Sequence, residues 1–177
     1  MTSPTASQAG EAIIRRSGSD GVAASPSRPA TQEVNWNLRY DIHLGATWSR
    51  FMDGLRQRKL LANSCASCSR VFVPPQAYCE SCFEPTAEWL ELPAEGTLEV
   101  YTVAWHGFTG GPTPPYAIGG IRLDGASTLL MHHVVGVDFD SESDPKDALP
   151  FGTRVRAVWA EERVGHVLDI SHFEPAS

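Results

Sequence analysis

The chain contains four cysteines, arranged as two C-x-x-C pairs, and this arrangement constrains its fold more than any other feature. Cys65 and Cys68 form the first pair, and Cys79 and Cys82 form the second after a spacer of ten residues. A C-x-x-C turn directs both sulfurs into one concavity, so two facing turns make a tetrahedral cage of thiolates. The spacer is long enough for a small hairpin that brings the two turns together. The sequence therefore predicts a four-sulfur metal site.

The spacing of the cysteines matches the zinc-ribbon pattern, and tetrahedral sulfur ligation suits zinc. Because four sulfurs leave no coordination position open to water, we expect a structural zinc and not a catalytic one. Iron in the same cage stays an alternative, as do two disulfides or a redox-active C-x-x-C pair. Disulfides would require an oxidising compartment, which nothing in the sequence indicates, and redox chemistry would need only one pair.

Charge and hydropathy limit the partners that the chain can have. Its 177 residues carry a formal net charge of −7 with little clustering of basic side chains, which argues against binding to nucleic acid or to an anionic membrane. No apolar run approaches the roughly 18–20 residues that cross a bilayer, and the N-terminus lacks the apolar core of a signal peptide. We therefore expect a cytoplasmic protein without a membrane partner.

Composition and periodicity divide the chain into four segments. Residues 1–34 are rich in Ser, Thr, Ala, Pro and Gly and predict a disordered tail. Residues 35–59 form a helical segment, because apolar residues between Leu44 and Leu61 recur at helical spacing. Residues 60–93 hold the zinc ribbon, which is too small for a core of its own and depends on the metal.

The fourth segment, residues 94–177, has the period of two that is typical of β-strands. In its first strand, Leu98 and Val100 are expected on one face, and Tyr101 and Val103 on the other. Five short strands suit a small closed barrel, which is an OB-fold. The fold class is thus mainly β: an N-terminal amphipathic helix, a four-cysteine zinc ribbon and a C-terminal OB-fold barrel. The expected strands are Thr97–His106, Tyr116–Leu123, Ser127–Val137, Thr153–Ala160 and His166–Phe173.

Two groups of residues outside the loops could contact a partner or a ligand. Trp48, Phe51 and Leu55 form an apolar stripe on the helix, which either packs on its own domain or docks on another protein. Arg154 and Arg156 share one face of a strand, so they could meet phosphates or simply balance nearby acids.

A third group of candidate contact residues belongs to the loop Gly107–Tyr116. This loop is rich in glycine and proline and carries the aromatic residues Phe108 and Tyr116 beside His106. Loops on rigid barrels often bind ligands. The alternative is a tolerated connection in which His106 and Tyr116 are hydrogen-bonded internally.

The remaining polar clusters do not form a self-contained active site. The acidic run Asp138–Asp144 lacks the glycine and the final glutamate of a calcium loop. His132 and His133 are adjacent in a strand, so their side chains point to opposite faces and cannot chelate one ion. Neither a nucleophile elbow nor a nucleotide-binding glycine loop is present. We do not expect the chain to be an enzyme by itself.

The order of these parts resembles a known family. A helix with Phe51 and Leu55 leads into the ribbon, which carries Pro74-Pro75 between its two C-x-x-C turns. The motifs Gly-Thr-Leu-x-x-Tyr-Thr-Val, Pro-Tyr-Ala-Ile-x-x-Ile and Phe-Gly-Thr-x-Val then follow at Gly96–Val103, Pro115–Ile121 and Phe151–Val155. Over residues 40–175 the chain resembles the rubredoxin-like zinc-ribbon plus OB-fold proteins associated with acyl-CoA metabolism.

The resemblance implies a non-catalytic accessory subunit. Members of that family are partners of thiolase-fold enzymes, among them thiolases, acyltransferases and the aldolases that shorten steroid side chains. By implication this chain binds such an enzyme in a hetero-oligomer, helps to form or shield its acyl-CoA site, and serves lipid or steroid metabolism. Ser69 stands where a glycine is common in the family, and Glu80 stands where a proline is frequent. Both residues neighbour the metal ligands, so these departures concern the local geometry of the two C-x-x-C turns and not the presence of the metal. The implied zinc ligands are Cys65, Cys68, Cys79 and Cys82.

Two other functions stay open at this point. A stand-alone acyl-CoA-binding protein would require Arg154 and Arg156 to contact the CoA. A binder of single-stranded nucleic acid is the second, because zinc ribbons and OB-folds both serve that role. The net charge of −7 and the lack of interleaved basic and aromatic residues argue against the second function.

Overall fold

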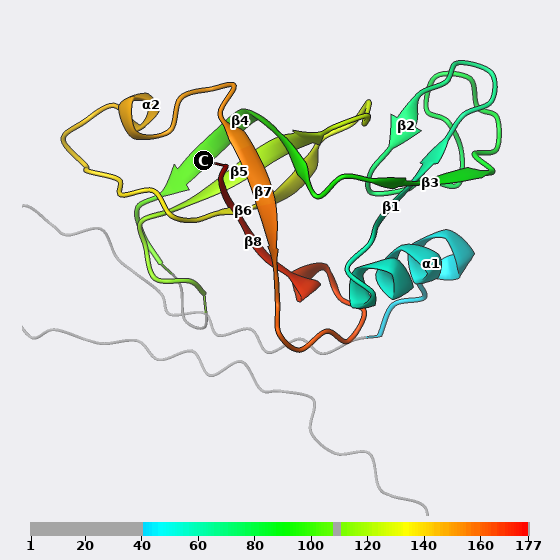
Figure 1. Cartoon of the computed structure of the whole chain (residues 1–177), viewed down its shortest axis with the longest axis horizontal. Helices are drawn as coiled ribbons and strands as arrows, with labels where there is room; N and C mark the ends of the chain where they lie inside the picture. The colour runs from blue at the N-terminus through cyan, green and yellow to red at the C-terminus, as the bar shows by residue number, and fades with distance from the viewer. Residues whose placement is uncertain (1–40, 108–110, 177) are drawn as a thin grey trace, which may run out of the picture. The chain divides into compact units, whose positions relative to one another are not determined.

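Residues 41–107 and 111–176 are described by a computed structural model of the chain (Figure 1). The expected tail at residues 1–34 and the candidate contact residue Phe108 lie outside the described residues. From Leu44 onward the chain forms one unit, which holds a helix, a three-stranded sheet and a closed barrel. The predicted fold class is therefore confirmed.

The helix α1 (Gly45–Arg56) ends before residue 59, where the expected helical segment ends. Arg58 adopts a left-handed backbone conformation with φ of 61°. Its N–H and that of Lys59 each donate a 2.9 Å hydrogen bond to a carbonyl of the last helical turn, which is a Schellman motif. Glycine usually takes this position, so an arginine there conceals the end of the helix in the sequence.

The zinc ribbon is built on a small antiparallel sheet. Strand β1 (Leu60–Ser64) lies in the centre, with β2 (Val71–Phe72) on one side and β3 (Glu88–Leu92) on the other. The chain between β2 and β3 carries the second cysteine pair, so both pairs lie at one end of this sheet (Figure 1).

The barrel consists of β4 (Glu95–Ala104), β5 (Tyr116–Leu123), β6 (Leu130–Val134), β7 (Arg154–Trp159) and β8 (Ile170–Pro175). It closes in the order β4-β5-β6-β8-β7, with β7 paired back onto β4. Neighbours are antiparallel except β6 and β8, which are parallel. The third strand was expected at Ser127–Val137, but β6 is shorter at both ends. The expected fifth strand begins on a 3-10 turn, η1 (Val167–Asp169). A short helix, α2 (Pro145–Ala148), lies in the connection between β6 and β7.

A β-bulge exchanges the two faces of β4. The pairing of β4 with β5 shifts its register between Leu98 and Val100. Leu98 is fully buried, whereas Val100 is 47% exposed and Tyr101 packs against the core. The expectation that Leu98 and Val100 share a face is therefore wrong, because the extra residue Glu99 turns the following side chains over.

The apolar core has two parts. The main core joins α1, β1 and β3 to the interior of the barrel, and it contains Phe51, Leu98 and Phe173. A separate, smaller cluster packs Phe72 between buried cysteines of the ribbon. Only the second cluster contains cysteines of the predicted metal site.

Candidate functional site

The four cysteines are presented by two turns of the same construction, here called the first knuckle (residues 65–70) and the second knuckle (residues 79–84). In each knuckle the N–H four residues after the leading cysteine donates to the carbonyl of that cysteine, at 2.8 and 2.9 Å. The N–H of the leading cysteine donates to the carbonyl five residues on, at 3.0 and 2.9 Å. Ser69 and Phe83 hold equivalent positions and are left-handed, with φ of 59° and 58°.

The two knuckles place all four sulfurs in one cluster. The Sγ atoms lie within 4.8 Å of one another, and those of Cys68 and Cys79 are 3.6 Å apart. Tetrahedral zinc with Zn–S bonds of about 2.3 Å needs sulfurs roughly 3.8 Å apart, so the cage fits the ion. None of the four cysteines is in a disulfide in this structure, so all four sulfurs can serve as metal ligands. The site is a structural zinc site.

The closeness of the four cysteines shifts their pKa values in opposite directions. The backbone N–H of Cys82 donates to Cys79 Sγ at 3.5 Å and, together with Ser81, lowers the pKa of Cys79 to about 7. The hydrogen bond with Cys68 and the other crowded thiols raise the pKa of Cys82 to about 12. Four thiolates cannot coexist so closely without a positive charge among them, and a divalent ion supplies that charge.

Two side chains outside the cage hold the knuckles in place. Asn63 is fully buried in β1 and donates from Nδ2 to Thr86 Oγ1 at 2.8 Å and to the Gln76 carbonyl at 2.6 Å. Arg70 of the first knuckle reaches across to the second, where it pairs with Glu80 at 2.6 Å. Glu80, which departs from the common proline, thus links the two knuckles.

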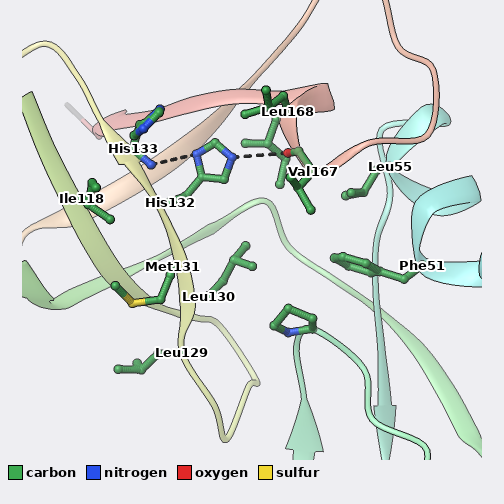
Figure 2. Close-up of a pocket in the computed structure, with 12 residues that line it drawn as sticks. Phe51, Leu55, Ile118, Leu129, Leu130, Met131, His132, His133, Val167 and Leu168 are labelled. Carbon is green, nitrogen blue, oxygen red and sulfur yellow. Dashed lines mark hydrogen bonds between the residues drawn. The ribbon is translucent and has the colours of Figure 1, made fainter. Parts of the chain in front are cut away.

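A second candidate site is an apolar pocket of about 380 Å³, drawn in Figure 2. One wall comes from the barrel strands β5 and β6, through Ile118 and Met131, and from Leu129, which precedes β6. The facing wall comes from α1, through the buried Phe51 and Leu55 (Figure 2). The sequence does not predict this pocket, because its walls come from segments far apart in the chain.

The loop between β7 and β8 closes one end of the pocket with Val167 and Leu168, and Asp169 organises that loop. The buried Asp169 carboxylate accepts from the N–H groups of Val164 at 3.0 Å and Gly165 at 2.7 Å. Burial acts to raise the pKa of Asp169, but these backbone hydrogen bonds outweigh it and lower the pKa below its usual value. His166 and Asp169 form a capping box. Because histidine replaces the usual serine or threonine, this motif is not recognisable from the sequence.

His132 ties strand β6 to the same loop. Its Nδ1 accepts the His133 N–H at 2.9 Å, so its Nε2 carries the proton and donates to the Val167 carbonyl at 3.3 Å (Figure 2). Burial lowers the pKa of His132, which keeps the ring neutral. Both ring nitrogens are therefore engaged within the protein, and His132 offers no free polar group to the pocket.

The structure separates the predicted contact residues on α1. Phe51 and Leu55 are fully buried, so the expectation that they contact a partner is corrected, and they pack on their own domain. Trp48 is 37% exposed, with its ring edge-on to Phe51 at 6.0 Å between centroids. Of these three residues, only Trp48 has a side chain that is exposed to solvent.

The other predicted contact residues lie on the barrel. His106 is exposed, and the half-buried Tyr116 packs edge-on against His133 at 5.5 Å. Arg154 donates two 2.7 Å hydrogen bonds to Asp124. Arg156 donates to Glu174 at 2.8 Å. Both arginines thus pair with neighbouring carboxylates. This agrees with the second of the two interpretations above, in which they balance nearby acids.

Other ion-binding or membrane features are not seen in the part of the chain that the structure describes. Within residues 41–107 and 111–176, the four cysteines form the one group of three or more metal-binding side chains close enough to share an ion. In the acidic run, Asp140 accepts from Glu142 N–H and Asp144 caps α2. No helix among these residues combines the length and the apolarity that crossing a bilayer requires.

Comparisons with known proteins agree with this architecture. A family model described as "ChsH2, rubredoxin-like zinc ribbon domain" matches residues 52–87. A model described as "ChsH2, C-terminal OB-fold domain" matches residues 89–160. No curated protein matches the chain.

Two solved structures share the fold. The first is a protein of unknown function from the DUF35 family of Sulfolobus solfataricus, which is 25% identical with a TM-score of 0.52. The match covers 64% of this chain and 78% of that one. The second is a chain of the "Ltp2-ChsH2(DUF35) aldolase", 23% identical with a TM-score of 0.57. That match covers 78% of this chain and 100% of the other.

Proposed function

This chain belongs to the ChsH2-like family of rubredoxin-like zinc-ribbon and OB-fold proteins, and on that premise we propose that it is a non-catalytic accessory subunit of a thiolase-superfamily enzyme. It binds that enzyme in a hetero-oligomer and helps to form or shield its acyl-CoA site. The observation that carries the proposal is the match to the whole length of a chain from the Ltp2-ChsH2(DUF35) aldolase. A protein with this fold is thus part of an aldolase whose name also contains a second component, Ltp2.

The metal site supports a structural role for this chain. All four zinc positions are taken by cysteines, so the ion has no open position at which to activate water or a substrate. The zinc ribbon instead fixes one boundary of the apolar pocket, through Pro74.

The outer face of the barrel supports partner binding. Val100 and Met131 are 47% and 57% exposed and converge over Gly120. A Cβ atom on Gly120 would lie 2.8 Å from Val100 Cγ1 and 3.2 Å from Met131 Sδ. Exposed apolar side chains gathered on one sheet are typical of protein interfaces. We place the partner contact on this face, with Trp48 and Tyr116 as further candidates.

The alternatives receive less support from the same residues. A stand-alone CoA binder would use Arg154 and Arg156, yet both are paired with carboxylates. A nucleic-acid binder would present basic and aromatic side chains on β5 and β6, whereas Ile118, Leu130 and Met131 of these strands line an apolar pocket.

Co-purification tests the proposal directly. The tagged full-length chain is isolated from its native cell, bound proteins are identified by mass spectrometry, and zinc is measured. We expect a thiolase-fold protein in stoichiometric amount and about one zinc per chain. Val100→Glu should release the partner, whereas Val164→Glu, at a residue that is 71% exposed in the loop between β7 and β8, should not. Isolation of the zinc-loaded chain without any thiolase-fold protein would overturn the proposal.

A further inference from the structure

The second zinc knuckle presents aromatic side chains to solvent. Phe83 in this knuckle is 81% exposed, and Tyr78, which immediately precedes it, is 63% exposed. Tyr78 pairs with Pro85 in an isolated antiparallel bridge at the base of the knuckle, so both aromatic residues belong to one end of the zinc ribbon. Neither residue is a member of the two apolar core clusters. Their rings therefore stabilise the fold little through burial.

The backbone at Phe83 is strained as well as exposed. Its φ of 58° lies in the left-handed region, which a residue with a Cβ atom adopts only at a cost in energy. Ser69 holds the equivalent position of the first knuckle with φ of 59°, and the backbone hydrogen bonds of the two knuckles are alike. The knuckle thus accepts a small polar residue at this position. A strained ring that the fold does not require points to a function.

The surroundings of Phe83 are acidic. The exposed Glu84 follows it in the chain, and the exposed Glu80 lies in the same knuckle. Arg70 is the one basic residue within residues 65–86, and it is paired with Glu80. Four thiolates outweigh the charge of one divalent ion, so the zinc site adds to the negative charge. Such surroundings repel the phosphates of nucleic acids and anionic lipids, and they complement a protein pocket bordered by Lys or Arg.

This end of the ribbon adjoins the barrel face on which the partner contact is proposed. Met131 of that face and Pro74 of the ribbon line the same pocket. Tyr78 follows Pro74 by four residues, a span of at most about 14 Å. An interface of ordinary size buries about 800 Å² on each partner, which is wide enough to include both places. One partner can therefore cover the barrel face and the second knuckle together.

We propose that Phe83, together with Tyr78, is a second anchor for the thiolase-superfamily partner and enters an apolar pocket of that enzyme that is bordered by basic side chains. The inference rests on the proposed function, which supplies the partner. It adds a contact surface on the zinc ribbon, apart from the barrel face around Val100. The zinc then serves binding as well as folding, because the metal holds the knuckle that presents Phe83.

Replacing Phe83 with glycine separates binding from folding. Phe83→Gly removes the ring and relieves the left-handed strain, so the urea midpoint should be at or above that of the wild type, and zinc loss to a chelator should be no faster. Binding of the zinc-loaded full-length chain to the co-purified thiolase-fold enzyme should weaken by about tenfold or more, measured by biolayer interferometry. Ser69→Gly, the same change at the equivalent position of the first knuckle, should bind as the wild type does.

Charge reversal at Glu84 tests the basic border of the partner's pocket. Glu84→Lys should slow association with the enzyme at low salt, whereas Phe83→Gly should mainly speed dissociation. Added NaCl should weaken binding of the wild type more than binding of Glu84→Lys. Association of Glu84→Lys that is as fast as that of the wild type would overturn the basic border.

Three further results would overturn the anchor itself. The first is equal binding by Phe83→Gly and the wild type. The second is a lower urea midpoint with faster zinc loss in Phe83→Gly, which would make the ring a structural part of the knuckle. The third is an equal loss of binding in Ser69→Gly, which would assign the effect to the knuckle backbone.

These failures are distinguishable from failure of the proposed function. In each of them the thiolase-fold enzyme still co-purifies with the wild-type chain, so the proposed function stands without the anchor. Absence of that enzyme from the wild-type preparation would overturn the proposed function, and the inference with it.

Discussion

Thr128 and Val73 exchange two hydrogen bonds through a single hydroxyl: Thr128 Oγ1 accepts from the Val73 N–H at 2.9 Å and donates to the Val73 carbonyl at 2.8 Å. Ser127 makes a similar exchange with Val71, at 3.0 and 2.8 Å. The turn between β5 and β6 therefore holds the edge of the zinc ribbon. Pro74, the next residue in the chain, is thereby fixed in the wall of the apolar pocket.

Replacing Thr128 with valine should weaken this junction. Thr128→Val keeps the shape of the side chain but leaves the Val73 N–H and carbonyl without their partner. We expect the free energy of unfolding to fall by roughly 1–3 kcal/mol in urea denaturation. Thr102→Val, at an exposed position of β4, is the matched control and should stay within about 0.5 kcal/mol of the wild type. Equal effects of the two substitutions would show that the junction contributes nothing.

Replacing Ser69 with glycine should stabilise the first knuckle. Ser69 is left-handed, which costs about 1–2 kcal/mol for a residue with a Cβ atom. Glycine removes that cost but loses roughly 0.5–1 kcal/mol of chain entropy, so we expect a net gain below about 1 kcal/mol. A higher urea midpoint and slower loss of zinc to a chelator would report the gain. Ser67→Gly, in the same knuckle but without positive φ, should bring no gain, and an equal gain there would refute the explanation.

Removing the Asp169 carboxylate should change the dependence of stability on pH. The pKa of Asp169 is lowered on folding, so the folded state binds fewer protons than the unfolded state in acid. Its stabilisation is present above the ordinary value of 3.8 and is lost as the pH falls through the lower folded value. Asp169→Asn should therefore be less stable than the wild type at neutral pH.

The difference between the two proteins should shrink as the pH falls below 3.8. Urea unfolding of both proteins across this range gives the difference directly, and zinc loss in acid affects both alike. A difference that stays constant with pH would contradict a role for the ionised carboxylate.

Removing zinc should loosen the knuckles before the barrel. The small cluster around Phe72 includes two zinc-site cysteines, whereas Leu60 of β1 packs in the main core. We expect a chelator to speed amide hydrogen exchange across residues 65–84 while β5 and β6 stay protected. Uniform loss of protection over the whole chain would show that the barrel also depends on the metal.

The zinc site and the barrel were predictable because each leaves a local pattern in the sequence. The two C-x-x-C pairs specify the cage through their spacing, and alternating apolar residues specify the strands. The end of α1 was missed because Arg58 takes a left-handed position where glycine is the usual signal. The faces of β4 were assigned wrongly after Leu98 because a bulge leaves no mark in the alternation itself.

The pocket was not predictable from the chain alone. Its walls combine Phe51 of α1, Met131 of β6 and Leu168 of a loop, and no short-range pattern relates these residues. Phe51 and Leu55 were candidates for a docking surface because helical spacing identifies the apolar face of a helix but not what covers that face. Only the packing of α1 on its own domain showed that they are buried.

The most direct test of the account is the activity of the co-purified thiolase-fold enzyme with and without this chain. The enzyme is assayed alone, with the zinc-loaded wild-type chain, and with Val100→Glu, using its acyl-CoA substrate. We expect kcat/KM to depend on the wild-type chain, and we expect Val100→Glu to fail to restore it. An enzyme whose kcat/KM is the same in all three assays would contradict the assignment of this chain as an accessory subunit.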